Sequence, residues 1–164
     1  MNPAWKRVIA GSSIRTTLLR AALLAVITWL LFTQVLTVCR LDGASMEPTM
    51  KNRSVRIVNL LKYKKNDPAR GDVVVISPAG RRVYYLKRIL GLPGETVGFN
   101  AGQFTVNGQP QEEPYLTDRG DWNMEPAVLE ADEYFVAGDN RAVPIERHLI
   151  GIVSREKIAG GLLW

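Results

Sequence analysis

Residues that form disulfides and hold metals are almost absent from this chain. Its 164 residues include one cysteine, Cys39, and one histidine, His148. A disulfide within the chain needs two cysteines, and structural zinc sites need several Cys or His ligands. The sequence also lacks a phosphate-binding glycine loop. It therefore excludes an intrachain disulfide, and we expect neither a metal site nor a cofactor.

Acidic residues are missing from the first part of the chain. The first carboxylate is Asp42, whereas four basic residues stand before the apolar run at 21–39, namely Lys6, Arg7, Arg15 and Arg20. The whole chain carries a formal net charge of +5. A basic balance raises nucleic acid or an anionic membrane surface as a partner. The basic residues are scattered and form no nucleic-acid-binding motif, so we expect the lipid bilayer and not nucleic acid.

Charge is absent from the apolar run at residues 21–39, which lies between Arg20 and Arg40. A helix of roughly 20 residues spans the hydrocarbon core of a bilayer. We predict a transmembrane signal-anchor helix over 21–39. The excess of Lys and Arg before it predicts a cytoplasmic tail over 1–20 and an extracytoplasmic domain over 40–164. The run is too long for a cleavable signal peptide, and lipidation of Cys39 stays open.

The residues after Arg40 carry strand patterns that turn residues interrupt. Alternating, β-branched or aromatic runs predict strands over 54–59, 71–76, 82–90, 96–99, 103–106, 127–129, 134–136, 151–153 and 158–159. Asn107-Gly108 predicts a tight hairpin turn. We expect a mostly β, antiparallel domain, with an exposed loop over 109–121. Residues 160–164 either cap the core or touch the membrane.

A serine directly after the apolar run is the first candidate for chemistry. Ser45 stands between a glycine and a proline, a pattern that in isolation is typical of an ordinary turn. A serine nucleophile needs a nearby base. Lys87 has large apolar neighbours, and desolvation lowers the pKa of a lysine until a neutral amine can accept a proton. Spacing alone favours a structural strand-edge lysine, and His148 is a second candidate base.

Four stretches in this order resemble the type I signal peptidases, also called leader peptidases. They are residues 43–49 (GASMEPT), 70–74 (RGDVV), 85–94 (YLKRILGLPG) and 138–141 (GDNR). The resemblance runs from the apolar segment to about Gly160. It implies a serine endopeptidase of the plasma (inner) membrane that needs no cofactor. Such an enzyme removes signal peptides from exported precursor proteins on the outer face, cutting after small-x-small sites.

The resemblance also implies roles for individual residues. Ser45 corresponds to the nucleophile and Lys87 to the general base, and Gly43 and the backbone of Ser45 correspond to the oxyanion site. The positions near the substrate groove are Met46 and Tyr85, and those that support the site are Asp139 and Arg141.

Two positions depart from the family pattern. Gly43 has no side-chain hydroxyl for an oxyanion, and Pro144 stands where a serine usually orients the lysine. Ser77 or a water molecule is then the candidate for that orienting role. These departures keep two alternatives open: a dedicated maturation peptidase for a pilin or conjugation precursor, and a catalytically impaired, membrane-anchored binding domain.

Overall fold

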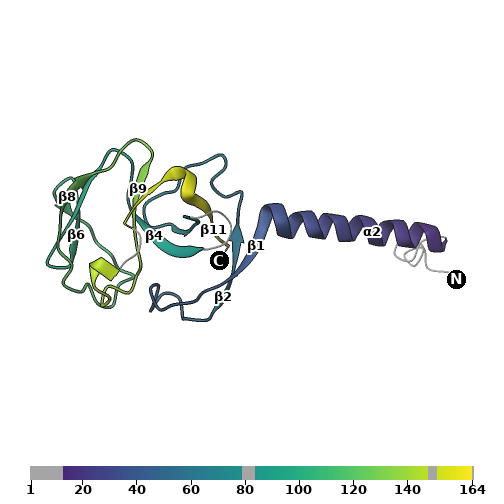
Figure 1. Ribbon diagram of the computed structural model, residues 1–164, viewed down its shortest axis with the longest axis horizontal. Coiled ribbons are helices and arrows are strands. Elements are labelled where there is room, and N and C mark those ends of the chain that lie inside the picture. The colour runs from purple at the N-terminus through teal and green to yellow at the C-terminus, as the bar shows by residue number, and fades with distance from the viewer. Residues whose placement is uncertain (1–12, 79–83, 148–150, 164) are drawn as a thin grey trace.

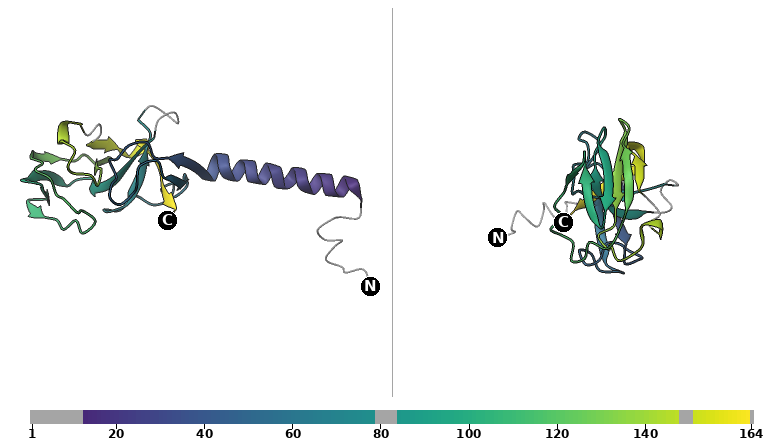
Figure 2. Two further views of the ribbon diagram at one scale, coloured as in Figure 1. Left: turned by 90° about the horizontal axis from the view of Figure 1, so that it is seen from below. Right: turned by 90° about the vertical axis from the view of Figure 1, so that its left-hand side faces the viewer.

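An isolated helix and a β domain make up the protein. The computed structural model describes residues 13–78, 84–147 and 151–163. Helix α2 (Ile14–Leu30) continues through a π-helical turn, η1 (Leu31–Val35), and projects away from the strands (Figure 1). A second view, at right angles, shows α2 extending away from the β domain (Figure 2).

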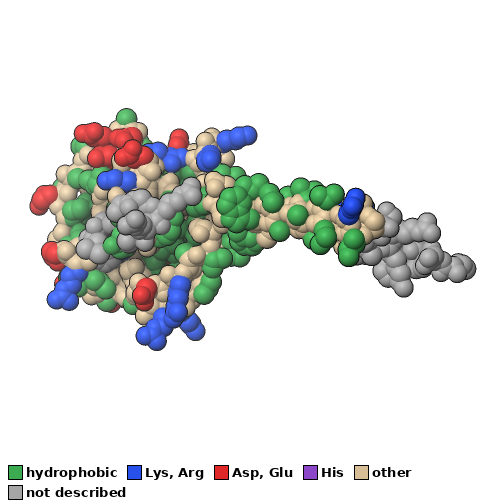
Figure 3. Space-filling view, turned by 45° about the vertical axis from the view of Figure 1, so that its right-hand side comes forward, with side chains coloured by type: hydrophobic (Ala, Val, Ile, Leu, Met, Phe, Trp, Pro, Cys, Tyr) green, Lys and Arg blue, Asp and Glu red, His purple; other side chains and the backbone are tan. Residues whose placement is uncertain are grey.

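The helical segment is long and apolar enough to cross a membrane. It covers 22 residues, Ile14–Val35, with a mean hydropathy of 1.9. At about 1.5 Å per residue this length matches the hydrocarbon core. Hydrophobic side chains are exposed along it (Figure 3), which fits association with a membrane.

The predicted helix over 21–39 is wrong at both ends. Helix α2 already begins at Ile14, and strand β1 (Leu36–Arg40) replaces the last predicted turn. β1 pairs antiparallel with β2 (Val55–Asn59) over its whole length. An apolar run has no feature that separates helix from buried strand by itself, and Thr37 and Val38 are β-branched residues that suit a strand.

The larger sheet has seven strands in the order β1-β2-β11-β3-β4-β9-β10, with antiparallel pairing throughout. The remaining members are β3 (Val73–Ile76), β4 (Tyr85–Gly91), β9 (Glu133–Ala137), β10 (Ile152–Ser154) and β11 (Ile158–Leu163). All four residues of β3 are buried because a hydrophobic cluster covers each face of the sheet. This explains why β3 reads as a continuous apolar run.

The smaller sheet has four strands in the order β7-β6-β5-β8. They are β5 (Thr96–Asn100), β6 (Gln103–Val106), β7 (Gln109–Pro110) and β8 (Met124–Val128). Asn107 and Gly108 both have positive φ, 50° and 76°, so the predicted hairpin turn is confirmed. An aromatic cluster of Phe99, Phe104, Trp122 and Phe135 joins this sheet to β9 of the larger one. Short 3-10 turns, η2 (Ile145–Arg147) and η3 (Arg155–Lys157), complete the fold.

The structure decides two further predictions. Residues up to Leu162 at the C-terminal end belong to the core, because β11 lies between β2 and β3 and Leu162 is buried. The prediction of an exposed loop over 109–121 is wrong for Glu113, which is buried, and for Tyr115, which is partly buried. Both contact arginines that come from distant strands and loops, and no local sequence pattern reports such contacts.

Candidate active site

Two buried methionines anchor the turn that carries Ser45. Met46 and Met50 pack into the hydrophobic cluster under β3, and the N–H of Met50 donates to the carbonyl of Met46 at 2.8 Å. The N–H of Glu47 donates to the carbonyl of Ala44 at 3.1 Å. Ser45, one residue before the first anchor, remains only half-buried. The turn therefore holds its backbone firmly while leaving the serine accessible.

Two backbone amides are expected at the oxyanion site, and only one of them already donates a hydrogen bond to another residue. The N–H of Gly43 donates to Oδ1 of Asn52 at 3.0 Å. The N–H of Ser45 donates to no other residue in the described part of the chain. Gly43 itself adopts a φ of +125°, a conformation that favours glycine. The Ser45 amide is thus a ready hydrogen-bond donor, whereas the Gly43 amide is already engaged.

Lys87 lies in the middle of the larger sheet. It pairs with Val74 across β3, and 5% of the residue is exposed. Burial lowers the pKa of its amine below the ordinary lysine value, and the nearby charge of Asp139 acts in the opposite direction. Among the residues that the structure describes, none forms a hydrogen bond or ion pair with this amine. Both conditions favour a neutral amine that can take a proton.

A narrow groove brings the serine turn and the lysine strand together. One wall consists of residues 39–43 with Ser45 and Met46, and the other consists of Tyr84, Tyr85 and Leu86. Its volume is about 60 Å³. The predicted groove residues Met46 and Tyr85 both line it, and Lys87 directly follows the second wall.

The loop after β9 joins the same two elements. The N–H of Asn140 donates to the carbonyl of Ser45 at 3.0 Å, and its side-chain amide donates to the carbonyl of Ala44 at 3.1 Å. The preceding residue, Asp139, supplies the charge that acts on Lys87. The loop over 138–141 therefore contacts the Ser45 turn through Asn140 and contributes to the electrostatic surroundings of Lys87 through Asp139.

Buried ion pairs hold this loop. Arg88 donates to both carboxylate oxygens of Asp139, at 2.8 and 2.6 Å, and to the carbonyl of Gly71 at 2.8 Å. Arg141 forms a two-pronged pair with Glu113, and its side chain is fully buried. The sequence pointed to Asp139 and Arg141, but their partners were missed. Arg88 stands beside Lys87 in a motif, whereas nothing local distinguishes Glu113 from the exposed Glu112.

The group that orients Lys87 is not the serine suggested by the sequence. β3 and β4 pair Val74 with Lys87, so Ser77 lies three positions past Val74, one residue beyond the end of β3. At about 3.4 Å per residue this is roughly 10 Å away, and alternation turns Ser77 toward the opposite face. Pro144 is exposed and accepts the N–H of Arg147 at 3.0 Å. His148, the alternative base, lies outside the described residues.

The described residues also bear on metal binding. Within residues 13–78, 84–147 and 151–163, no three side chains of the metal-binding types (His, Cys, Asp and Glu) come together as a potential site. The side chains that line the groove are a serine hydroxyl, two tyrosine phenols, a thiol, one exposed carboxylate, an arginine and apolar groups, and the Lys87 amine belongs to the next residue of the same strand. This set suits nucleophilic and acid–base chemistry.

Comparison with known proteins identifies the family. The family model described as signal peptidase, peptidase S26, matches residues 14–163. The chain belongs to this family. Signal peptidase I of Leptolyngbya laminosa is 36% identical over 128 residues, which cover 73% of this chain and 63% of that protein. The resemblance inferred from the four motifs is therefore confirmed.

Two further relatives agree with this assignment. Signal peptidase I S of Bacillus subtilis (strain 168) is 37% identical over 131 residues, covering 73% of this chain and 70% of that protein. The probable signal peptidase I-2 of Synechocystis is 34% identical over 126 residues, covering 73% of this chain and 58% of that protein. The chain thus spans less than two thirds of the Leptolyngbya and Synechocystis relatives.

Proposed function

We propose that this chain is a membrane-anchored serine endopeptidase that removes signal peptides from exported precursors. Ser45 is the nucleophile and Lys87 is the general base. The observation that carries this proposal is the meeting of an accessible serine turn and a buried lysine strand at one groove. Membership of the signal peptidase family supports the assignment of the substrate class.

In the reaction that we propose, the Oγ of Ser45 attacks the carbonyl carbon of the scissile bond while its proton passes to the neutral amine of Lys87. The N–H of Ser45 donates to the oxyanion that forms. The Lys87 ammonium then protonates the leaving nitrogen, the C–N bond breaks, and an ester remains on Ser45. A water molecule then attacks this ester as Lys87 takes its proton, the C–Oγ bond breaks, and Lys87 returns the proton to Oγ, which releases the signal peptide and restores both Ser45 and the neutral Lys87.

The precursor binds in an extended conformation between the two walls of the groove. β4 pairs with β3 from Tyr85 to Arg88, whereas its pairing with β9 starts only at Arg88. One edge of Tyr85–Lys87 therefore has backbone groups to offer, and residues 41–43 line the same groove. A substrate strand inserted there gains hydrogen bonds by β-augmentation. The narrow groove suits small side chains before the cut.

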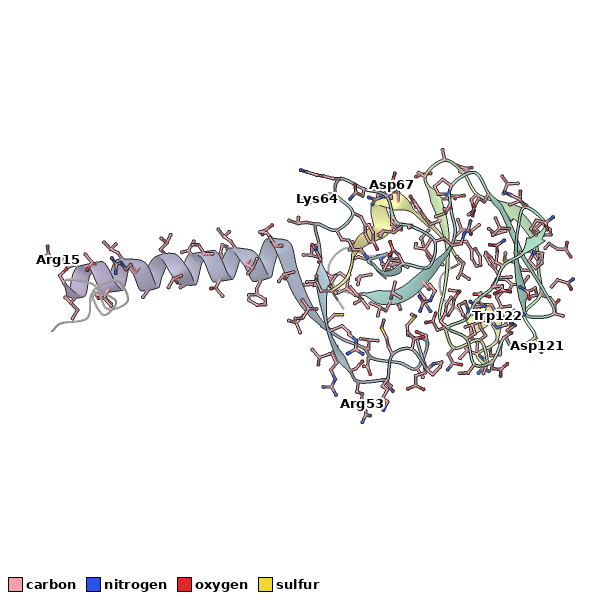
Figure 4. The ribbon with its side chains drawn as sticks, turned by 180° about the vertical axis from the view of Figure 1, so that it is seen from behind. Arg15, Arg53, Lys64, Asp67, Asp121 and Trp122 are labelled. Atoms are coloured by element: carbon pink, nitrogen blue, oxygen red, sulfur yellow. The ribbon has the colours of Figure 1, made fainter. Side chains whose placement is uncertain are left out.

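We infer that this groove lies near the outer surface of the plasma membrane. Residues 14–35 span the bilayer, and the basic residues before and within the first turns of the helix keep the N-terminus in the cytoplasm. Arg15 lies at the helix end remote from the β domain (Figure 4). Ser45 follows the helix after a single strand, so it acts where a membrane-held signal peptide presents its cleavage site.

Cleavage of a precursor with an Ala-x-Ala site tests the proposal. Detergent-solubilised protein should cut this precursor, and the Ser45→Ala variant should not. Ser54→Ala is the matched control, because that hydroxyl donates to the carbonyl of Lys51 away from the groove. Equal cleavage by the wild type and the Ser45→Ala variant would contradict the proposal.

Depletion of the protein from cells separates a general enzyme from a dedicated one. A general signal peptidase should leave many exported precursors unprocessed when it is depleted. Accumulation of one precursor, with bulk export unchanged, would instead identify the dedicated maturation enzyme.

A further inference from the structure

The loop between β7 and β8 inserts two side chains into the buried charges beside the site. Glu113 pairs with Arg141, whose side chain is fully buried. The hydroxyl of Tyr115 donates to Oε1 of Glu113 at 2.5 Å, and its ring centroid lies 3.9 Å from the guanidinium carbon of Arg88. Glu113 and Tyr115 thus connect Arg141, which lies in the loop after β9, with Arg88, which binds that loop from β4.

These contacts fix Asn140 from both sides. Its neighbour Asp139 is held by Arg88, and its other neighbour Arg141 is held by Glu113. Arg141 also donates to the carbonyl of Gly138 at 3.0 Å, which closes the loop on itself. Asn140 is then left with both of its amides directed at the carbonyls of the Ser45 turn.

The same three segments also meet at a cavity. A hollow of about 250 Å³ is lined by Glu47 and Pro48 of the nucleophile turn, by Thr117 and Asp118, and by residues 139–142. The loop over 113–118 and the turn that carries Ser45 therefore face the same cavity, with residues 139–142 beside both.

We propose that Glu113 and Tyr115 are positioning residues of the peptidase site, which hold residues 138–141 against the Ser45 turn. Neither touches the groove. They act by fixing the carbonyl of Ser45 through Asn140, which sets the direction of the Ser45 hydroxyl and amide. The kinetic part of this inference rests on the proposed function, whereas its structural part does not.

Amide hydrogen exchange of the detergent-solubilised full chain tests the structural part without catalysis. In Glu113→Gln, the Asn140 amide should lose protection by about tenfold or more relative to the wild type, because its hydrogen bond to Ser45 opens locally. The Val136 amide, which donates to Gly151 at 2.8 Å within the larger sheet, reports global stability. Its protection should change by less than about twofold.

Two outcomes of the exchange experiment would overturn the proposal. One is unchanged protection at Asn140, and the other is a parallel loss at Asn140 and Val136, which indicates only general destabilisation. Tyr115→Phe provides a second variant if Glu113→Gln fails to fold, since it keeps the ring on Arg88 and removes only the hydroxyl. Tyr115→Phe should also lower the protection of the Asn140 amide, by a smaller factor than Glu113→Gln does. Glu112→Gln, at the exposed neighbour, is the matched control.

Kinetics then test the consequence for cleavage. With activity normalised to folded protein, Glu113→Gln should lower kcat by about 100-fold, since small displacements of reacting groups cost about that much. KM should stay within about threefold, because the groove walls are unchanged. A wild-type kcat, or a change confined to KM, would contradict the positioning role. If the wild type itself does not cut the precursor, the proposed function fails while the exchange result still stands.

Discussion

The turn that carries Ser45 and the strand that carries Lys87 are built in opposite ways. The turn is exposed on one side, and its backbone is held by short local hydrogen bonds and by two buried methionines. The strand lies inside a seven-stranded sheet, and Lys87 is nearly inaccessible to solvent. A nucleophile must reach its substrate, whereas a lysine base must lose its hydration to become neutral. The roles that we propose for Ser45 and Lys87 need these two properties, and the two residues lie on different kinds of element.

The comparison also separates local from distant support. The Ser45 turn is stabilised by residues within ten positions of it, such as Asn52 and Met50, and Asn140 is the one distant residue described above that donates hydrogen bonds to it. The surroundings of Lys87 depend on Asp139 and, through it, on Arg88. Substitutions at the turn should therefore have local effects, whereas substitutions near the lysine should alter both the stability of the fold and the chemistry.

Removal of the base is expected to have the largest effect. Lys87→Met should lower kcat by about 10²–10⁴, the usual contribution of a general base. Lys157→Met, an exposed lysine in η3, is the matched control and should cut normally. The measurement is steady-state cleavage of the same Ala-x-Ala precursor. Near-normal turnover by Lys87→Met would contradict the proposed role of the buried strand that carries Lys87, in contrast to the accessible Ser45 turn.

Removal of the carboxylate beside Lys87 comes next. The side chain of Asp139 is fully buried, so Asp139→Asn leaves Arg88 without its charged partner. Such a change costs about 3–5 kcal/mol in the free energy of unfolding, which denaturant titration measures. The pKa of Lys87 should also fall further, because the charge of Asp139 raises it. An unchanged midpoint of unfolding would show that this pair does not support the strand.

The stability of the protein should depend on pH through Lys87. Burial lowers the pKa of this amine in the folded state, so between the folded and the unfolded pKa the unfolded chain binds more protons. The free energy of unfolding should therefore rise as the pH increases through the folded pKa. Lys87→Met should remove this part of the slope and stabilise the fold below that pKa. If the free energy of unfolding of Lys87→Met depends on pH as steeply as that of the wild type, or more steeply, this would argue against a desolvated lysine.

The smallest effect is expected at the turn. Gly43 has a φ of +125°, and a Cβ added there would meet no atom within 4 Å. Gly43→Ala should therefore destabilise the protein by about 1 kcal/mol through backbone strain alone. The fall in kcat should stay below about tenfold, because the Ser45 amide remains available. A loss as large as that of Lys87→Met would show that Gly43 takes part in oxyanion binding.

The sequence predicts the parts of this structure that local patterns govern. Alternation and β-branched residues locate β2, β3 and β6, and Asn107-Gly108 locates the hairpin turn. The end of the helix at Val35 escapes prediction because the apolar run continues into β1 without a break in composition. Pairing with β2, more than fifteen residues later, decides where the helix stops.

The candidate site also has residues that the sequence indicates and features that depend on contacts between distant parts of the chain. The motifs indicate Ser45 and Lys87, but the burial of Lys87 depends on the strands on either side of β4. Glu113 lies in a stretch whose Gln, Glu and Pro residues are typical of an exposed loop. Its burial is set by Arg141, which is distant in the sequence. The suggestion of Ser77 as a partner of Lys87 fails because it depends on strand register, which composition does not reveal.

The pH dependence of kcat tests the pairing of Ser45 with a neutral Lys87 most directly. Lys87 acts only when it is deprotonated, so turnover should rise with pH through the pKa of its amine. We predict one rising limb with a midpoint below the ordinary lysine value of about 10.4, and the same limb in His148→Gln. A rise centred near about 6.5, the ordinary pKa of histidine, which disappears in His148→Gln, would contradict the account.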